Sequence, residues 1–201
     1  MQVQQRRQRF PRVLATGLLA LAALFSTQPK AESTLHPVRG FLPDLRFELT
    51  TSENKQVTQD DFKGKVVLMF FGYASCPDIC PTTMAQLSEV VHRLGDDGEQ
   101  VSVLFVSVDP HRDTPEVLDA YVKAFDTNAI GLTGNERTIA SVARRYRVAY
   151  QITKPENPDE KHYDVAHSRG IYIFDAEGKA RILASDSESV DRLTDAVRGI
   201  L

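Results

Sequence analysis

One uninterrupted apolar run, residues 66–72 (VVLMFFG), constrains the fold of this chain more than any other feature. A continuous run of this length is typical of a strand that is buried on both faces of a sheet. A loop with both cysteines of the chain, Cys76 and Cys80, follows it. Apolar residues then repeat at helical spacing up to Gly95. The pattern predicts a central strand that delivers a two-cysteine loop to the start of a helix.

The rest of the chain alternates between strand and helix patterns. A second buried strand is predicted at residues 101–108, and helices are predicted after Thr114 and Asn135, through about residues 125 and 147. A strand, a crossover helix and a further strand imply parallel pairing. The remaining predicted elements are strands at 47–50 and 148–152, a capped turn at 58–62, a loop at 154–161, a hairpin at 171–174 and 180–183, and a helix from 190 to 201.

These elements predict an α/β protein with one domain. A chain of 201 residues with 42% apolar residues can bury one ordinary core. The predicted domain comprises residues 32–201 and has a central mixed sheet flanked by helices. Residues 1–31 form an N-terminal extension.

The extension has the composition of an export signal. An apolar block at residues 13–25 follows four arginines, and it is shorter than the roughly 20 residues that a membrane-spanning helix prefers. Ala31 fits a cleavage site, whereas Pro29 is not the small residue expected two positions earlier. Residues 1–31 are therefore either a signal peptide or an N-terminal membrane anchor through residues 13–25. In both cases we expect a periplasmic domain, either released or held at the inner membrane.

The charge distribution argues against a nucleic-acid partner. The extension holds five of the 24 basic residues and no acidic one, which leaves 19 basic against 27 acidic residues in the remainder. Binding to phosphates needs a clustered basic face, and the acidic domain shows no basic cluster in its sequence.

The two cysteines can bind a soft metal or form a disulfide. Pro81 is suited to the first helical position, which would place Cys80 at or beside the helix N-terminus. Such a position favours the thiolate, which is both a nucleophile and a metal ligand. A purely structural disulfide would gain little rigidity in so short a loop. A structural zinc site requires four ligands, and the chain has no further cysteine to complete one.

Three separated motifs resemble the Sco/SenC family, whose members are copper-binding, thioredoxin-like assembly factors for cytochrome c oxidase. The motifs are FGYASCPDICPTT at residues 71–83, SVDP with RDTPE at residues 107–116, and YDVAHS at residues 163–168. They occur in the family's order, and the resemblance covers roughly residues 38–201. It implies a thioredoxin-like fold.

The resemblance also implies a copper site made by Cys76, Cys80 and His167. Thiolates select Cu(I), and imidazole binds copper in either oxidation state. The implied function is that of a metallochaperone that passes copper to the copper-accepting subunit of the oxidase, at its dinuclear copper centre. A thiol reductant or another copper carrier would load it, because only the dithiol can hold the ion.

An alternative function uses the same cysteines as a redox pair. A thiol-disulfide oxidoreductase would use Cys76 and Cys80 to reduce the cysteines of an acceptor protein, so the enzymatic status of the chain stays open at this stage. Thioredoxin-type reductases have two residues between their cysteines, and this chain has three. Peroxiredoxin chemistry is disfavoured because Pro77 stands where those enzymes are expected to have Thr.

Neighbouring polar residues receive smaller roles. Asp109 and Pro110 end the second buried strand at the same sheet edge, where they either support the site or form a simple turn. Asp78 is expected in solvent, and His111 outside the ligand set. Ala166 stands where some family members carry Asp before the ligand histidine, which removes only an accessory carboxylate.

Overall fold

The computed structural model describes residues 34–38, 40, 42–125, 129–153 and 163–201. The chain separates into two units, Met1–Glu32 and Ser33–Leu201, and the described residues belong to the second. The predicted leader and the predicted loop at 154–161 therefore lie outside the described residues.

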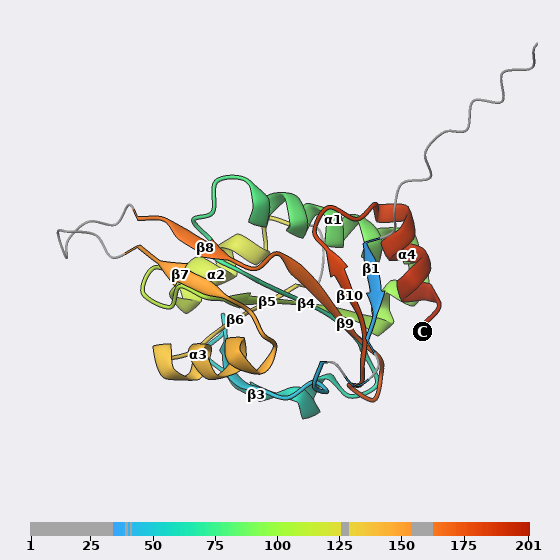
Figure 1. The fold of residues 1–201 in the computed structure, drawn as a ribbon, viewed down its shortest axis with the longest axis horizontal. Coiled ribbons are helices and arrows are strands. Elements are labelled where there is room, and N and C mark those ends of the chain that lie inside the picture. Colours follow the sequence, from blue (N-terminus) through green and yellow to red (C-terminus); the bar gives the residue numbers. More distant parts are fainter. Residues whose placement is uncertain (1–33, 39, 41, 126–128, 154–162) are drawn as a thin grey trace, which may run out of the picture. The chain divides into compact units, whose positions relative to one another are not determined.

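Eight strands form one mixed sheet in the order β1-β10-β9-β4-β5-β6-β2-β3 (Figure 1). Its centre is β4 (Val66–Gly72), which pairs in parallel with β5 (Val101–Ser107) and antiparallel with β9 (Gly170–Phe174). The other strands are β1 (Leu35–Pro37), β2 (Glu48–Thr51), β3 (Gln56–Thr58), β6 (Ile130–Thr133) and β10 (Ala180–Ser185). Every residue of β4 is buried, which explains why its sequence shows no polar alternation.

The two faces of the sheet carry different aromatic residues because side chains alternate along a strand. On one face, Phe70 contacts the rings of Phe105 and His167. On the other, Phe71 contacts Tyr146 and Tyr172. Phe71 therefore packs away from the site, and Phe70 packs toward it.

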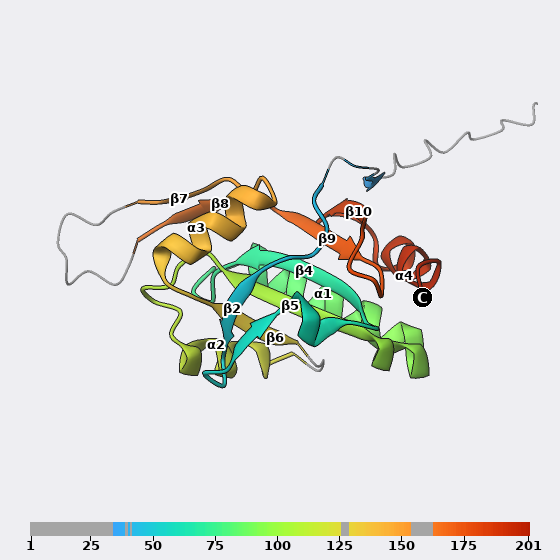
Figure 2. The same cartoon turned by 90° about the horizontal axis from the view of Figure 1, so that it is seen from below.

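Helices cover both faces of the sheet (Figures 1 and 2). The helix α1 (Ile79–Leu94) packs beside α4 (Val190–Arg198) on one face. On the same face, α2 (Pro115–Val122) places Tyr121 against Phe105. The helix α3 (Glu136–Arg145) lies on the opposite face, and Tyr146 just after it contacts Phe71. Two short 3-10 helices are η1 (Gln59–Phe62) and η2 (Gly95–Gln100).

This architecture confirms the predicted fold class, a thioredoxin-like mixed sheet flanked by helices. The predicted caps are also in place: Thr58, Thr114 and Asn135 each accept a backbone N–H at the start of their helices. The predicted helix ends were too late, because the helices end at Val122, Arg145 and Arg198.

A second, two-stranded sheet stands apart from the main one. It consists of β7 (Tyr150–Ile152) and β8 (Val165–His167), which pair antiparallel with one another. Figure 1 shows β8 running directly into β9 of the larger sheet. The strand predicted at 148–152 is thus shorter than expected, and His167 ends a strand that the sequence did not predict.

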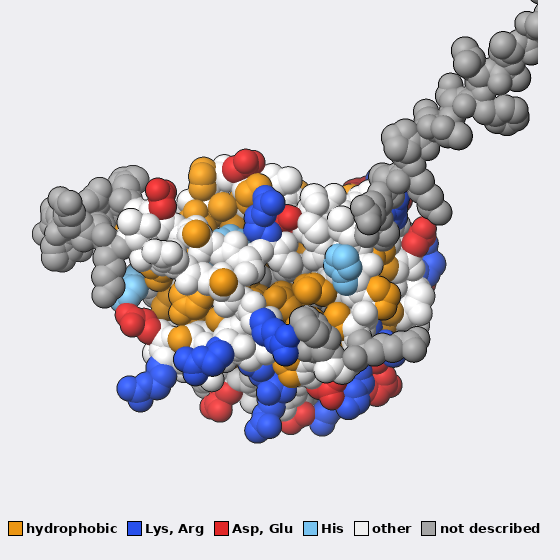
Figure 3. Space-filling view, in the orientation of Figure 1, with side chains coloured by type: hydrophobic (Ala, Val, Ile, Leu, Met, Phe, Trp, Pro, Cys, Tyr) orange, Lys and Arg blue, Asp and Glu red, His pale blue; other side chains and the backbone are white. Residues whose placement is uncertain are grey.

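Basic and acidic side chains are interspersed along the lower edge of the face drawn in Figure 3. In the described parts of the chain, no helix has both the length and the apolar character needed to cross a bilayer.

Candidate metal centre

Both cysteines lie where β4 leaves the sheet and α1 begins. The loop closes on itself through the Cys76 N–H, which donates to the Tyr73 carbonyl at 3.2 Å. The helix begins at Ile79 with Asp78 as its N-cap, so Cys80 lies in the first turn. The prediction that Pro81 opens the helix was therefore wrong by two positions. Proline fits here nonetheless, because the N–H groups of a first turn have no partner within the helix.

The two sulfurs differ in exposure. Cys76 is half-buried, whereas Cys80 is 0% exposed and its sulfur lies against Gly72. The backbone N–H of Cys80 points at the Cys76 sulfur, 3.5 Å away. Both thiols are free in this structure. The first cysteine of the pair is therefore partly accessible to solvent, and the second is not.

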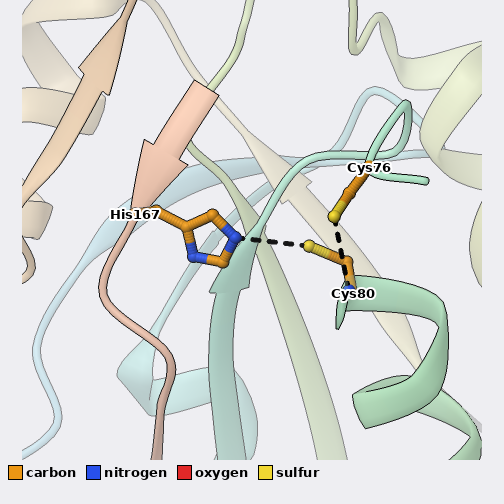
Figure 4. Close-up of side chains that lie close together, drawn as sticks. All are labelled: Cys76, Cys80 and His167. Carbon is orange, nitrogen blue, oxygen red and sulfur yellow. Dashed lines mark hydrogen bonds between the residues drawn. The ribbon is translucent and has the colours of Figure 1, made fainter. Parts of the chain in front are cut away.

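His167 lies far from the cysteines in the sequence, at the end of β8, and its ring faces the Cys80 sulfur. Its Nε2 lies 3.4 Å from the Cys80 sulfur (Figure 4). Its Nδ1 lies 2.9 Å from the Ser168 carbonyl oxygen, which can only accept, so Nδ1 carries the proton. The lone pair of Nε2 is therefore directed at the sulfurs, as in a metal-ligating histidine.

Aromatic rings hold the imidazole in place. The rings of Phe70 and Tyr73 both meet the His167 ring edge-on, with centroids 6.0 and 5.9 Å away. These contacts restrict rotation of the imidazole. They also remove it from water, and this burial lowers the pKa of His167. Burial therefore favours the neutral form, which is the form that can bind a metal.

The pKa values of the two thiols are shifted in opposite directions. Burial raises the pKa of the Cys76 thiol, but backbone N–H groups of Asp78 and Cys80 donate to its sulfur and bring the pKa below the ordinary value. Burial dominates at Cys80 and raises its pKa strongly. Burial and the neighbouring sulfur of Cys76 raise the pKa of Tyr73 to about 12. Cys76 is thus the better thiolate of the pair.

The three donor atoms lie within 4.8 Å of one another. Two thiolates and one imidazole are a donor set for a soft ion of low coordination number, and they match Cu(I). The structure thus brings together the three residues that the resemblance implied, from the loop after β4, from α1 and from β8.

Other residues considered in the sequence fall outside this group. Asp78 is exposed, as expected. His111 is exposed and pairs with Glu136 at 2.6 Å. Asp109 is 0% exposed, pairs with Arg112, and accepts a hydrogen bond from the Tyr163 hydroxyl at 2.7 Å. Asp109 thus begins a turn, and its side chain is held in a buried polar cluster with Arg112 and Tyr163.

Sequence reasoning missed Asp113, a buried carboxylate behind the cysteine loop. Its Oδ2 accepts the Ala74 N–H at 2.9 Å and the Ser107 hydroxyl at 2.6 Å. Asp113 thereby ties the cysteine loop to the end of β5. The available signal was the charged segment directly after a largely apolar strand, which is where polar groups gather at a sheet edge.

The family model for SCO1/SenC matches residues 42–201. The chain belongs to the SCO1/SenC family. The resemblance inferred from the three motifs is thereby confirmed.

Similar chains occur in bacteria and mitochondria. A SCO2-like protein of Rickettsia felis is 39% identical over 133 residues, which are 66% of this chain and 64% of that protein. The mitochondrial SCO1 homolog 1 of Arabidopsis thaliana is 39% identical over 152 residues, which are 75% of this chain and 45% of that protein. The match thus spans less than two thirds of either relative.

Solved structures of the family share the fold. Bradyrhizobium japonicum ScoI with copper bound gives a TM-score of 0.71 at 35% identity, over 79% of this chain and 99% of that one. Arabidopsis thaliana ScoI with copper bound gives 0.69 at 37% identity, over 77% of this chain and 94% of that one.

Proposed function

We propose that this protein is a copper metallochaperone that carries copper on Cys76, Cys80 and His167. The observation that carries the proposal is the convergence of the three donor atoms to within 4.8 Å. The copper-bound Bradyrhizobium and Arabidopsis relatives support it. Copper is the cargo, taken up by displacement of the two thiol protons.

The acceptor in this proposal is the copper-accepting subunit of cytochrome c oxidase, at its dinuclear copper centre. Transfer proceeds by ligand exchange. Cys76 and His167 are half-buried and Cys80 is fully buried, so acceptor ligands approach copper from the Cys76 side and Cys80 releases it last. A thiol reductant or another copper carrier reloads the protein.

Anaerobic titration of the reduced protein with Cu(I), against a competing chelator, tests the site. Wild type should bind one ion tightly. Cys76→Ser should lose that site and His167→Ala should weaken it strongly. His111→Ala is the matched control, because His111 is an exposed histidine outside the group. If His167→Ala binds copper as tightly as wild type, the proposed site is wrong.

Transfer is tested by mixing the copper-loaded protein with the apo copper-binding domain of the oxidase subunit. Copper should appear on the acceptor. The Cys80→Ser variant should transfer less copper, because it binds less copper than wild type. Retention of all copper by the chaperone would contradict this acceptor.

A second function, thiol-disulfide exchange, is favoured by the unequal thiols. The Cys76 thiolate would attack an acceptor disulfide and form a mixed disulfide, releasing one acceptor thiol. Cys80 would then attack the Cys76 sulfur and release the second thiol. Two electrons pass to the acceptor, and a small thiol of the compartment reduces the Cys76–Cys80 disulfide again.

Cys80→Ser provides the test, since it should trap the mixed disulfide while Cys76→Ser should not. No trapped species with an oxidised acceptor subunit would refute the exchange.

We also propose that the domain acts outside the cytoplasm. The support is the leader-like composition of residues 1–31. N-terminal sequencing of the protein from periplasmic and membrane fractions separates cleavage after Ala31 from retention as an anchor. Recovery of the intact chain from the cytoplasm alone would contradict export.

A further inference from the structure

His167 ends β8, and among the described residues the β7–β8 arm (the hairpin of these two strands) makes no strand pairing with the main sheet. β7 and β8 pair with one another and form a sheet of their own. A two-stranded ribbon is at best marginally stable in water. Only Ser168 and Arg169 join His167 to β9 of the main sheet, so its position relative to the sulfurs depends on this short connection together with side-chain contacts between the arm and the body of the domain.

Arg112 makes such contacts with both halves of the site. Its guanidinium lies over the Tyr163 ring, 3.7 Å from the centroid, and 5.4 Å from the centroid of the Tyr73 ring. Tyr73 belongs to the cysteine loop, and Tyr163 leads into β8. One guanidinium N–H also donates to the Tyr163 carbonyl at 2.9 Å. A single planar cation thus bridges the cysteine side and the histidine side.

Asp109 fixes this cation. Its carboxylate is fully buried, pairs with the Arg112 Nε, and accepts the Tyr163 hydroxyl at 2.7 Å. The Asp109 N–H in turn donates to the Ser107 hydroxyl, which binds Asp113 behind the cysteine loop. The connected hydrogen bonds fix the geometry more firmly than isolated contacts would.

We propose that Arg112 is a positioning residue that holds the β7–β8 arm, and with it His167, against the cysteine loop. The inference rests on the proposed copper site. It goes beyond that site because Arg112 offers no ligand atom to the ion. Residues that orient a ligand typically change metal affinity by about 10- to 100-fold when they are removed.

A double-mutant cycle measures this role. Arg112→Met should lower the Cu(I) affinity by about 10- to 100-fold. In a His167→Ala background it should have no further effect, because the imidazole that it positions is gone. A general structural defect would lower the affinity by the same factor in both backgrounds.

Arg181→Met is the matched control. Arg181 also pairs with a carboxylate that is almost fully buried, Asp175, at 2.9 Å. It lies on β10, and its carboxylate partner Asp175 is not a residue of the site. We expect this variant to lose thermal stability as Arg112→Met does, but to keep the wild-type copper affinity.

Tyr163→Phe provides a milder variant in case Arg112→Met does not fold. It removes the hydroxyl that binds Asp109 and leaves the ring under the guanidinium. Its loss of affinity should be smaller and should also vanish in the His167→Ala background.

The outcomes separate the two proposals. If His167→Ala weakens binding but Arg112→Met and Tyr163→Phe bind like Arg181→Met, the positioning role is refuted and the copper site stands. An effect of Arg112→Met that persists without the imidazole also refutes it. If His167→Ala binds like wild type, both proposals fall.

Discussion

Gly72→Ala tests how closely the core is packed against the metal site. Gly72 ends β4, directly before the cysteine loop. A Cβ atom there would lie 2.8 Å from the Cys80 sulfur and 2.9 Å from a ring carbon of Phe105, where ordinary contacts begin at 3.4 Å. Each neighbour must therefore move by about 0.5 Å or more. Both side chains are fully buried, so neither can move out into solvent.

The cost follows from the overlap. Overpacking a tight core typically costs about 1–3 kcal/mol, and each kcal/mol lowers the melting temperature of a chain of this size by about 2–4 °C. The displaced atom is a proposed copper ligand that lies 3.4 Å from the His167 Nε2. We therefore expect a lower copper affinity in addition to the lower stability.

Thermal unfolding of the apo protein and the Cu(I) titration measure the two effects. Gly199→Ala is the control, because a Cβ there meets its nearest neighbour at 3.5 Å, an ordinary contact. A Gly72→Ala protein that melts and binds copper as wild type does would refute the packing argument.

Two buried carboxylates should make opposite contributions to the pH dependence of protein stability. Burial raises the pKa of Glu188, but donors from Ser189 and Thr34 outweigh it and hold the pKa below its usual range. Its contribution is present above the unfolded-state pKa and is lost as the pH falls through the folded-state pKa. Glu188→Gln should therefore cost about 2 kcal/mol at neutral pH, with the deficit closing in acid; a constant deficit in urea unfolding would contradict this. Burial raises the pKa of Asp113, so its contribution is greatest at low pH and falls as the pH rises through the folded-state pKa. The free energy of unfolding of Asp113→Asn, taken relative to that of wild type, should therefore be higher at pH 7 than at pH 4. The reverse order would show that partners stabilise the Asp113 carboxylate.

Local sequence patterns determined most of the fold. The apolar run of β4 predicts a strand buried on both faces, because no position in it could face water without cost. Thr58, Thr114 and Asn135 predict helix starts, because their side chains supply an acceptor to an otherwise unpaired N–H. These are interactions between neighbours in the chain, so neighbours in the chain suffice to reveal them.

Element ends were less well determined. The start of α1 at Ile79 differs from the prediction because proline is tolerated anywhere in a first turn. The strand that ends at His167 was missed because three residues paired with one distant strand leave no periodic pattern.

Only the tertiary structure determined that the three site residues lie close together in space. His167 meets Cys80 across 87 positions of the chain, and the contact depends on how β8 enters β9 beside β4. The motifs indicated which residues to consider, but the placement of Arg112 between Tyr73 and Tyr163 has no local signature. Contacts of this kind arise from the packing of segments that lie far apart in the chain, so no local pattern of residues reveals them.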